Sequence, residues 1–531
     1  MALTSYRTPG VYVEWLDVNP QYIEVGRTDV AGFVGLAERG PVQQAVKIES
    51  YRQFFTTFGR RLAAGYLAYA VAGFFENGGR LCWVVRVADP DQARPARARL
   101  LVAERPPFVL EAVNPGTWGN DIVVEAIWGR DRVTHLTVRT LDGRAQSIDL
   151  DQMDTTRPAG SELHTNLLGV ADWTLPEFAA EDIVRTAADT TWIPLQELTP
   201  ELRSVRLGGG ADGLATLTVD HFTAHPVREG VWGVDCLDRV DGISFVAVPD
   251  LMAGQDVAGG AGPFTGFNRD QLRDAQLAVI NSCMRRRDRV AILDMPPVGH
   301  DEICRYASGW SRTSFAAFYH PWLVVSDPLR LRRNVRRIPP SGHVAGVYAR
   351  TDRQRGVHKP PANEILEGVF DVRQPIDDIA HGELNDSAVN AIRAIAGRGV
   401  LVLGARTLDP DIRWRYVNVR RLFAMIEEAL DEQMQWLTFE PNNPRLWRDI
   451  DRTLRGFLER LYRLGMLDGE SSEKAYFVRC DETTNPPWET DEGRVRCDVG
   501  IQPPFPAEFV VVRIGVTRSG IEVQEKGAQD A

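Results

Sequence analysis

GISFVAVP at residues 242–249 and VAILD at residues 290–294 are two short, almost wholly apolar runs, and the segment around residues 272–284 between them has a helical pattern. Runs of this length and composition are typical of strands that are buried on both faces. A strand, a helix and a second strand in this order predict a right-handed crossover within a parallel or mixed sheet. The chain is therefore expected to have an α/β centre.

The same pattern occurs nearer the N-terminus. Residues 29–35 (DVAGFVG) form an apolar run that ends in glycine, and residues 66–75 place apolar side chains at helical spacing. Residues 77–79 (NGG) supply the left-handed position that ends such a helix. Residues 81–87 (LCWVVRV) then predict another interior strand. The chain thus begins as α/β.

Between about Asp89 and Gly213 the composition changes. The segment is first rich in Pro and Arg, and then shows alternating strand patterns at residues 121–128 and 135–139. A glycine-rich stretch at residues 207–213 closes it. We interpret this segment as an inserted β-rich domain.

Two amphipathic helices are predicted nearer the C-terminus, at residues 419–434 and 447–461. Gly465 is placed to end the second helix. The apolar faces of both helices are more typical of core packing than of a membrane or cofactor surface.

The two ends of the chain carry strand patterns that have no obvious partner. Apolar and polar side chains alternate in residues 11–15 and again in residues 521–524, and turn-forming residues separate both runs from what they flank. A strand at a free terminus can pair with an open sheet edge of another copy, so the pattern predicts an assembly. The proposed interchain arm residues are Val11, Tyr12, Val13, Trp15, Ile521 and Val523.

Composition and charge limit the classes of function that the chain can have. The 531 residues are enough for about two to four domains, with 44% hydrophobic and 25% charged residues and a formal charge of −11. Interspersed charges of both signs argue against a nucleic-acid partner. A basic run at residues 330–337 could contact phosphate, but a solvated or intersubunit face is favoured.

The six cysteines are scattered without any C-x-x-C pair, so no zinc site is predicted. Cys480 and Cys497 could pair only if the fold brings them together. The N-terminus lacks the pattern of a signal peptide, and nowhere do about 18 apolar residues run together. We therefore expect synthesis in the cytoplasm and no direct membrane insertion.

No motif predicts catalysis or a cofactor. The chain lacks a P-loop, its glycine clusters at residues 208–210 and 259–262 read as loops, and residues 309–313 (GWSRT) fail the nucleophile-elbow pattern at the last position. Asp235, Asp238 and Asp241 lack the spacing of a calcium loop and are interpreted as surface or capping acids.

The histidines do not indicate a site either. His300 precedes Asp301 and His320 precedes Pro321, but no Ser or Cys partner is indicated, so structural roles are favoured. The sequence predicts no catalytic residues, no cofactor and no metal site. An enzyme whose residues converge only in the fold stays open as an alternative.

Several stretches, in the same order, resemble the contractile tail sheath family of contractile phage tails, R-type bacteriocins and extracellular contractile injection systems. The N-terminal ones are TPGVYV (8–13), AGFVG (31–35) and FFENGG (74–79); the C-terminal ones are PPSGHVAGVYA (339–349), RGVHKPPAN (355–363), GARTL (404–408), RYVNVRR (415–421), FEPN (439–442) and PAEF (506–509).

On this resemblance the fold class is α/β (α+β mixed) and multidomain, with an inserted β-rich domain and extended strand arms. The expected parts are an N-terminal arm (1–25), a first part of the core (26–88), a β-rich outer domain (89–213), the core α/β and C-terminal sheath domain (214–507), and a last core strand with the C-terminal arm (508–531).

The resemblance implies a non-enzymatic subunit of a six-fold helical sheath that surrounds an inner tube and contracts once. Its other implied partners are baseplate and tail terminator or cap proteins, and an AAA+ ATPase that recycles the spent sheath stays open. The arms would complete a sheet on neighbouring subunits, and flexible links at residues 20–27 and 515–520 would let the bodies rotate. A phage tail-like particle released on lysis is the implied location.

The resemblance also directs attention to two surfaces. The charged helix at residues 417–437 is the candidate inner wall or interface, with intersubunit core as the alternative. The candidate tube-facing or interface residues on it are Arg420, Arg421, Glu427, Glu428 and Asp431. Arg355, His358 and Lys359 form either an interface latch or a turn that local hydrogen bonds stabilise.

Two other functions stay open: a sheath-like baseplate or cap component that does not polymerise, and a cytoplasmic α/β enzyme with a ligand cleft. The sequence does not distinguish a phage tail from a bacteriocin or an extracellular injection system. It also leaves open the cargo, the helical parameters and whether a structure shows the extended or the contracted state of the sheath. The large insertion favours a particle with a decorated exterior.

Overall fold

The computed structural model describes residues 23–101, 108–128, 133–140, 145–149, 171–174, 193–194, 204–223, 230–255, 266–310, 312–327, 334–508, 514–517 and 520–523. The described residues divide into two compact units. One unit takes those within Met1–Gly26 and Ile426–Pro504, and the other takes those within Arg27–Met425 and Phe505–Ala531. Each unit is described by itself below.

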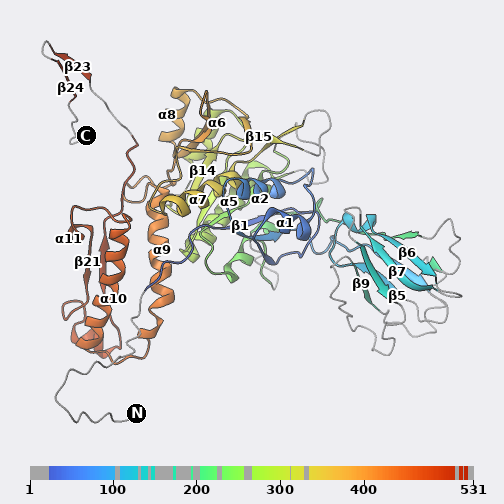
Figure 1. Ribbon diagram of the computed structural model, residues 1–531, viewed down its shortest axis with the longest axis horizontal. Helices are drawn as coiled ribbons and strands as arrows, with labels where there is room; N and C mark the ends of the chain where they lie inside the picture. The colour runs from blue at the N-terminus through green and yellow to red at the C-terminus, as the bar shows by residue number, and fades with distance from the viewer. Residues whose placement is uncertain are drawn as a thin grey trace, which may run out of the picture. The chain divides into compact units, whose positions relative to one another are not determined.

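The larger unit is built on a nine-stranded mixed sheet (Figure 1). Six neighbouring strands are parallel, and antiparallel strands close both edges. The strand order is β17 (Glu364–Ile365), β20 (Gly399–Val402), β19 (Val389–Ile395), β14 (Ala316–His320), β13 (Val290–Asp294), β12 (Phe245–Ala247), β1 (Val30–Gly35), β3 (Leu81–Arg86) and β2 (Ala45–Ile48).

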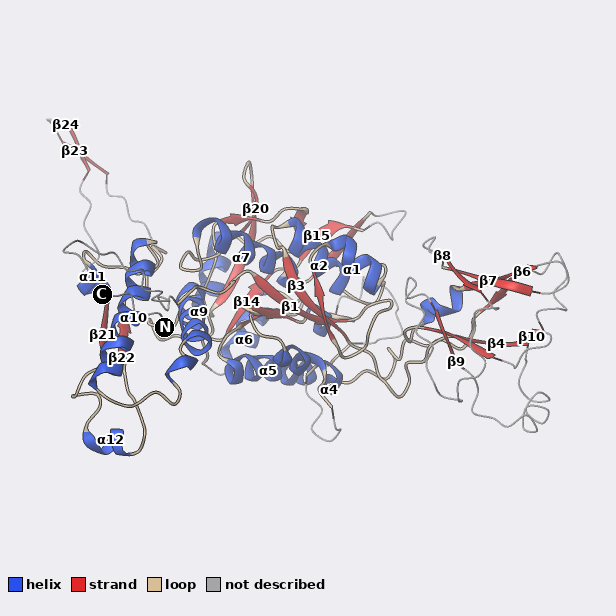
Figure 2. Cartoon of the chain, turned by 60° about the horizontal axis from the view of Figure 1, so that its bottom comes forward, coloured by secondary structure: helices blue, strands red, loops and turns tan. Residues whose placement is uncertain are grey.

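Helices cover both faces of this sheet. Figure 2 shows α2 (Leu67–Glu76) and α7 (Ser341–Arg355) on one face and α5 (Arg269–Arg286) and α6 (His300–Ser308) on the other. The unit also contains α1 (Tyr51–Phe58), α4 (Val219–Phe222), α8 (Asp378–Asp386), the 3-10 helices η4 (Gly233–Arg239) and η5 (Pro249–Met252), and a three-stranded sheet of β16 (Val335–Ile338), β15 (Leu323–Ser326) and β18 (Val369–Val372).

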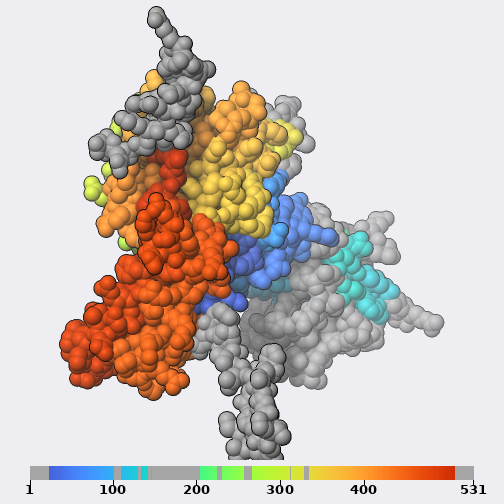
Figure 3. Space-filling view, turned by 60° about the vertical axis from the view of Figure 1, so that its left-hand side comes forward, coloured from blue at the N-terminus to red at the C-terminus, as the bar shows by residue number. Residues whose placement is uncertain are grey.

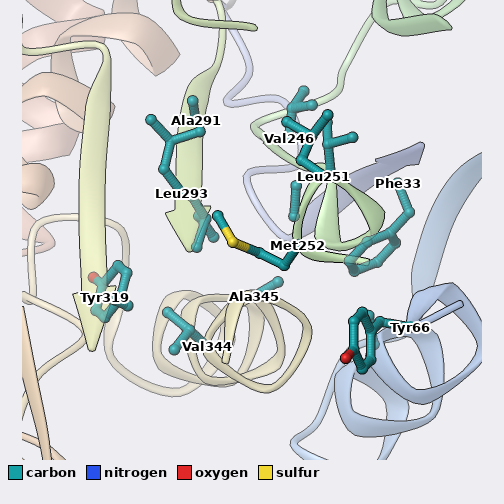
Figure 4. Packing of buried hydrophobic residues seen from close by; sticks show 14 of the residues in the cluster. Phe33, Tyr66, Val246, Leu251, Met252, Ala291, Leu293, Tyr319, Val344 and Ala345 are labelled. Carbon is teal, nitrogen blue, oxygen red and sulfur yellow. The ribbon is translucent and has the colours of Figure 1, made fainter. Parts of the chain in front are cut away.

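The strands predicted at residues 29–35, 81–87, 242–249 and 290–294 and the helix around 272–284 are all present. Every residue of β13 is buried, which explains its uninterrupted apolar run. Asn268 and Gln271 begin α5 with reciprocal hydrogen bonds to the backbone. Figure 4 shows Leu293 of β13 on the side of Val344 and Ala345 of α7, with Ala291 farther up the same strand in the core.

Helices α2 and α7 cross at very close range because glycines lie at the contact. A Cβ atom built at Gly342 would lie 2.3 Å from the Ala70 Cα, and one at Gly346 would lie 2.6 Å from the Phe74 carbonyl oxygen. Both obstacles are backbone atoms, which cannot rotate away as a side chain can. The two helices therefore depend on glycine at these positions.

Gly342→Ala is therefore expected to destabilise the protein by about 1–3 kcal/mol, because the added methyl group overpacks the helix crossing. Gly382→Ala in α8 is the matched control, since a Cβ atom there meets nothing within 4 Å. Alanine normally favours a helix over glycine, so the control should be neutral or slightly stabilising. Urea unfolding midpoints measure both; equal midpoints for the two variants would contradict the close crossing.

The segment after β3 folds around a core of its own. It contains two four-stranded sheets and a separate buried cluster that includes Leu110, Leu136 and Val138. The sheets comprise β10 (Ile193–Pro194), β4 (Arg97–Leu101), β5 (Phe108–Ala112) and β9 (Ala171–Thr174), and β11 (Ser204–Arg206), β6 (Val123–Trp128), β7 (Val133–Arg139) and β8 (Ala145–Asp149); η1 (Thr117–Asp121) joins β5 to β6.

The smaller unit contains the second of the two predicted amphipathic helices, α10 (Pro444–Arg463), and Gly465 follows it with φ 71°. The first, α9 (Val417–Gln433), contains the boundary between the units. The smaller unit also has η6 (Gln435–Leu437), α11 (Ser472–Ala475), α12 (Pro487–Asp491) and a sheet of β21 (Tyr476–Arg479) and β22 (Asp498–Ile501). A hairpin of β23 (Ile514–Thr517) and β24 (Gly520–Val523), nearer the C-terminus, is part of the larger unit.

The fold is mixed α/β with a large mixed sheet and several smaller ones, as predicted. Among the described residues, no helix combines the length and the apolar character needed to cross a membrane.

Candidate intersubunit interface

The smaller unit presents a two-stranded sheet that lies on one helix. Strands β21 and β22 are antiparallel, and Figure 1 shows β21 beside α10. The Tyr476 hydroxyl donates a hydrogen bond to Glu459 of α10 at 3.0 Å, and Val478 is buried. The apolar face of α10 thus holds β21 in place.

The outer edge of β22 is open. The Gln502 N–H donates to the Ala475 carbonyl oxygen at 2.8 Å, so this pair marks the hydrogen-bonded positions of the ladder. Because these positions alternate, the N–H and C=O groups of Val499 and Ile501 point away from β21. Within the described part of the chain, β22 pairs with β21 alone. We call the outward groups of Val499 and Ile501 the β22 edge.

Apolar side chains are exposed around this edge. The Phe477 ring covers Gly500 on the opposite strand, yet Phe477 is 53% exposed. Trp488 is 61% exposed and Val499 is 37% exposed. Figure 3 shows one face of this unit in orange and red. An unpaired edge beside exposed aromatic and aliphatic side chains is the surface that an added strand requires.

The N-terminal segment is anchored at Glu24, near the start of the described residues. The Gln433 side-chain amide donates to the Glu24 carbonyl oxygen at 2.5 Å, and its oxygen accepts a hydrogen bond from the Glu24 N–H. This pair of bonds fixes residue 24 at the end of α9. The predicted arm residues Val11, Tyr12, Val13 and Trp15 lie outside the described residues.

The C-terminal segment is anchored at Glu508. Its carboxylate accepts hydrogen bonds from Arg406 at 2.8 and 2.6 Å and from the Tyr416 hydroxyl at 3.0 Å. Partial burial alone would raise the pKa of Glu508, but the hydrogen bonds and charge of Arg406 outweigh it and the pKa is lowered. Glu508 is therefore ionised at neutral pH, and the segment that follows it leaves from a fixed point.

Ile521 and Val523 lie in β24, which pairs with β23 of the same chain. This differs from the prediction of a single strand after a flexible link at residues 515–520, because residues 514–517 form the other half of a hairpin. The sequence reason is the turn-forming residues between two short β-rich runs, which favour a hairpin. Each strand of the hairpin has one side without a partner strand among the described residues.

The charged residues of α9 occupy very different environments. Arg420 and Arg421 are each only 3% exposed, so neither lies on an open inner wall in this conformation. Arg420 lies 4.6 Å from the Phe315 ring centroid, and Arg421 forms a bidentate ion pair with the buried Asp352 at 2.9 and 2.5 Å. Both arginines pack within their own subunit.

Farther along α9 the charges reach the surface. Glu427 and Glu428 are partly exposed, and Asp431 is exposed. Of the five charged residues named as tube-facing or interface candidates, these three acids remain accessible to a partner.

The latch residues divide in a similar way. The Lys359 ammonium donates to the carbonyl oxygens of Pro360 and Ala362 at 2.7 and 3.0 Å, and the His358 carbonyl accepts from Asn418. Arg355 is exposed at the end of α7. The local hydrogen bonds favour the stabilised turn for His358 and Lys359, and Arg355 alone is positioned for an external contact.

Several charged groups that the sequence singled out serve the subunit itself. Asp235 and Asp241 pair with Arg285 and Arg286 at the end of α5, at 2.7 and 2.8 Å. Arg336, from the basic run, is buried and donates to the carbonyl oxygens of residues 62 and 63, which corrects its interpretation as a solvated residue.

The two histidines of interest have different surroundings. His300 lies 2.8 Å from Asp301, and these two with Glu383 form the one group of possible metal-binding side chains among the described residues. Two of the three are exposed. His320 is buried, and burial lowers its pKa to about 3, so it is neutral at ordinary pH.

Two buried carboxyl groups were missed at the sequence level. Asp294, at the end of β13, accepts hydrogen bonds from the N–H and hydroxyl of Ser341, and burial raises its pKa to about 7. Asp250 accepts a hydrogen bond from the Leu36 N–H at 2.6 Å, and burial raises its pKa to about 6. Both acids hold loops at the carboxyl ends of strands. The available sequence signal was an acid at the end of a buried apolar run, as in VAILD at residues 290–294.

Comparison with known proteins assigns the class of molecule. The models named phage tail sheath protein central domain and phage tail sheath C-terminal domain match residues 261–408 and 409–517. A putative prophage major tail sheath protein of Pseudomonas aeruginosa is 25% identical over 234 residues, which cover 43% of this chain and 58% of that relative. The two models and this relative all describe tail sheath proteins. The two model matches, which together take in residues 261–517, and this relative support the contractile tail sheath family.

Solved structures share the fold over nearly the whole chain. The helical sheath of the anti-feeding prophage in its contracted state is 21% identical with a TM-score of 0.55, covering 97% of this chain and 100% of that one. The sheath complex of the extracellular contractile injection system PVC is 20% identical with a TM-score of 0.54, covering 98% and 99%. These relatives are described as sheath proteins, which agrees with the predicted structural role and gives no support to the enzyme alternative.

Proposed function

We propose that this protein is the subunit of a contractile tail sheath, in which copies polymerise helically with six-fold symmetry around an inner tube protein. Contraction of the sheath then drives the tube through a target envelope. The supporting observation is an open β22 edge in the same chain as two strand-forming terminal segments that leave from fixed points. A chain that carries both a strand acceptor and strand donors joins copies head to tail, and such contacts form an open helix when the rotation between copies does not close a ring.

In this proposal a terminal strand of one subunit pairs with the β22 edge of another. Val499 and Ile501 offer up to four main-chain hydrogen bonds, each contributing about 0.5–1.5 kcal/mol net. Phe477, Trp488 and Val499 supply apolar contact area for the incoming strand. Each link is modest, and the repetition of links along the helix makes the assembly stable.

Contraction would leave these interchain strands paired while the compact units rotate about the anchored segments at Glu24 and Glu508. Such a change is a rigid-body transition between two packings and needs no nucleotide at the firing step. Asp431, Glu427 and Glu428 are the α9 residues proposed to face the tube or a neighbouring subunit, and Arg355 is proposed to make an interface contact.

The other proposed partners are baseplate and tail terminator or cap proteins. Recycling by an AAA+ ATPase stays open. The proposed route is synthesis in the cytoplasm, assembly into a phage tail-like particle and release on lysis, with the β-rich segment 89–213 on the outside.

Proline at the β22 edge tests the proposal. Val499→Pro removes an outward N–H group, and proline is tolerated at edge positions of this kind, so the subunit should still fold. Loss of one hydrogen bond and the added steric block should raise the critical concentration for polymerisation about tenfold or more. Sedimentation and negative-stain electron microscopy measure the change.

The matched control is Ile365→Pro in β17. Ile365 also lies in an edge strand, opposite Leu401 at a position whose N–H faces outward. The control should polymerise like the wild type, and circular dichroism should show both variants folded. Normal polymers from a folded Val499→Pro variant would contradict the role of the β22 edge.

One observation favours a second candidate. A baseplate structure of the anti-feeding prophage has the same fold, with 21% identity and a TM-score of 0.55. A sheath-like baseplate component would copurify in few copies and would not polymerise alone, which the same microscopy distinguishes.

A further inference from the structure

Cys480 and Cys497 face each other across the β21–β22 ladder. The last pair of that ladder is Arg479 with Asp498, and the cysteines are the next residues beyond it, Cys480 after Arg479 and Cys497 before Asp498. The Ala475–Gln502 bond requires the hydrogen-bonded pairs to be 475 with 502, 477 with 500 and 479 with 498. Cys480 and Cys497 therefore fall at a non-hydrogen-bonded pair, where Cα atoms are about 4.5 Å apart. This spacing lies within the range of about 4.4–6.8 Å that disulfides span.

The two sulfur atoms are already in contact as thiols. The neighbouring Cys497 thiol is the main cause that lowers the pKa of Cys480, and the Cys480 thiol donates a hydrogen bond to the Arg496 carbonyl oxygen at 3.7 Å. The neighbouring Cys480 sulfur and partial burial raise the pKa of Cys497. Both residues are free cysteines in the structure.

Asn485 holds the cysteines in alignment. Its side-chain oxygen accepts from the Arg496 N–H at 2.7 Å, and its amide donates to the Arg496 carbonyl oxygen at 2.9 Å. The amide nitrogen also lies 3.9 Å from the Cys480 sulfur. These contacts fix the residue before Cys497 against the loop that follows Cys480, so the pair does not depend on the ladder alone.

The other cysteines lack this arrangement. Cys82 and Cys283 are buried, and burial raises the pKa of each thiol; that of Cys283 is about 12. Cys236 is also buried, with its pKa raised to about 12. Cys304 is partly exposed and lies in α6 of the larger unit, which makes it a suitable control.

We propose that Cys480 and Cys497 form a reversible intrachain disulfide when the protein meets a low-molecular-weight disulfide such as oxidised glutathione. Cys480 is buried and Cys497 is partly exposed, so the first reaction occurs at Cys497. The Cys497 thiol first releases its proton to water. The Cys497 thiolate then attacks the small disulfide and expels one small thiolate, which takes a proton from water.

The second step closes the bridge. Cys480 loses its proton to solvent and attacks the Cys497 sulfur of the mixed disulfide, and the second small thiolate leaves and is protonated. Two protein thiols are oxidised, and one small disulfide is reduced to two thiols. A subunit made in a reducing cytoplasm and then released would meet this change of conditions.

The bridge would join the two strands next to the β22 edge. It would close the chain from residue 480 to residue 497 into a covalent loop, which restricts the unfolded state. Oxidation should therefore raise the melting temperature of the smaller unit by several degrees. That the bridge also stiffens a strand acceptor rests on the proposed function; the reaction itself does not.

The test uses the full-length protein purified with reductant. It is incubated in glutathione buffers of graded redox ratio, quenched with an alkylating agent and analysed by mass spectrometry. We expect two of the six cysteines to become unreactive, a mass loss of about 2 Da, a linked peptide of Cys480 and Cys497, and full reversal by dithiothreitol. Polymerisation is not part of the readout, so failure here is distinct from failure of the sheath proposal.

Two variants sharpen the result. Cys304→Ser should react like the wild type, whereas Cys497→Ser should lose both the linked peptide and the rise in melting temperature. Stable glutathione on Cys497 with an unreacted Cys480 would overturn the proposal, and so would disulfide-linked dimers or an unchanged thiol count. The wild-type measurement stands by itself if Cys497→Ser does not fold.

Discussion

Deletion of residues 1–22 is expected to abolish polymers and to leave a folded subunit. The deletion removes the predicted strand around Val11, Val13 and Trp15 but keeps Glu24, whose hydrogen bonds with Gln433 anchor the segment. Each subunit then loses one donated strand while its own cores are unchanged. Sizing and electron microscopy should show small particles, and circular dichroism should match the full-length protein.

A matched deletion of residues 526–531 is the control, because that stretch has no alternating strand pattern. It should leave polymerisation unchanged. Long tubes from the protein that lacks residues 1–22 would show that contacts between the bodies of neighbouring subunits suffice for assembly. The proposed role of the N-terminal arm would then be wrong.

The second large effect concerns the buried ion pair of α9 and α7. Arg421→Met leaves the Asp352 carboxylate buried without its partner and removes a 2.8 Å hydrogen bond to the Thr28 carbonyl oxygen. Breaking one side of such a pair typically destabilises a protein by about 3–5 kcal/mol. We expect a loss of that size in the free energy of unfolding, measured with urea.

Two comparisons make this prediction specific. Replacing both partners, as in Arg421→Met with Asp352→Leu, should cost less than the single change, because no buried charge is left unpaired. Arg413→Met breaks an exposed pair with Asp411 and should leave the unfolding midpoint unchanged. A midpoint for Arg421→Met equal to that of Arg413→Met would contradict the importance of the buried pair.

The single variant should also depend on pH in a particular direction. Burial already raises the pKa of Asp352 in the wild type, and loss of the Arg421 charge and hydrogen bonds raises it further above its unfolded value of about 3.9. A raised acid pKa means that folding is favoured when the group is protonated. The loss in free energy of unfolding of Arg421→Met relative to the wild type should therefore shrink as the pH falls toward about 4 and grow as the pH rises.

The central sheet and its helices were predictable because burial leaves a strong local pattern. The wholly buried run VAILD and the helix stop at residues 77–79 needed no tertiary information. The charged residues of α9 were harder. Arg420 and Arg421 look like surface residues in sequence, and only the fold brings Phe315 and Asp352 to them.

The candidate interface was predictable only in part. Alternation at the termini indicated donor strands, but nothing local marks β22 as an open acceptor, since openness depends on which strands pair. The contact between Cys480 and Cys497 likewise depends on the register of β21 and β22, which sequence spacing does not fix.

The most direct test of the sheath proposal is negative-stain electron microscopy of the full-length protein, first alone and then with its tube protein. The proposal predicts hollow striated cylinders that lengthen around the tube. Uniform small particles in the presence of the tube protein would contradict it and would favour a baseplate component or an enzyme.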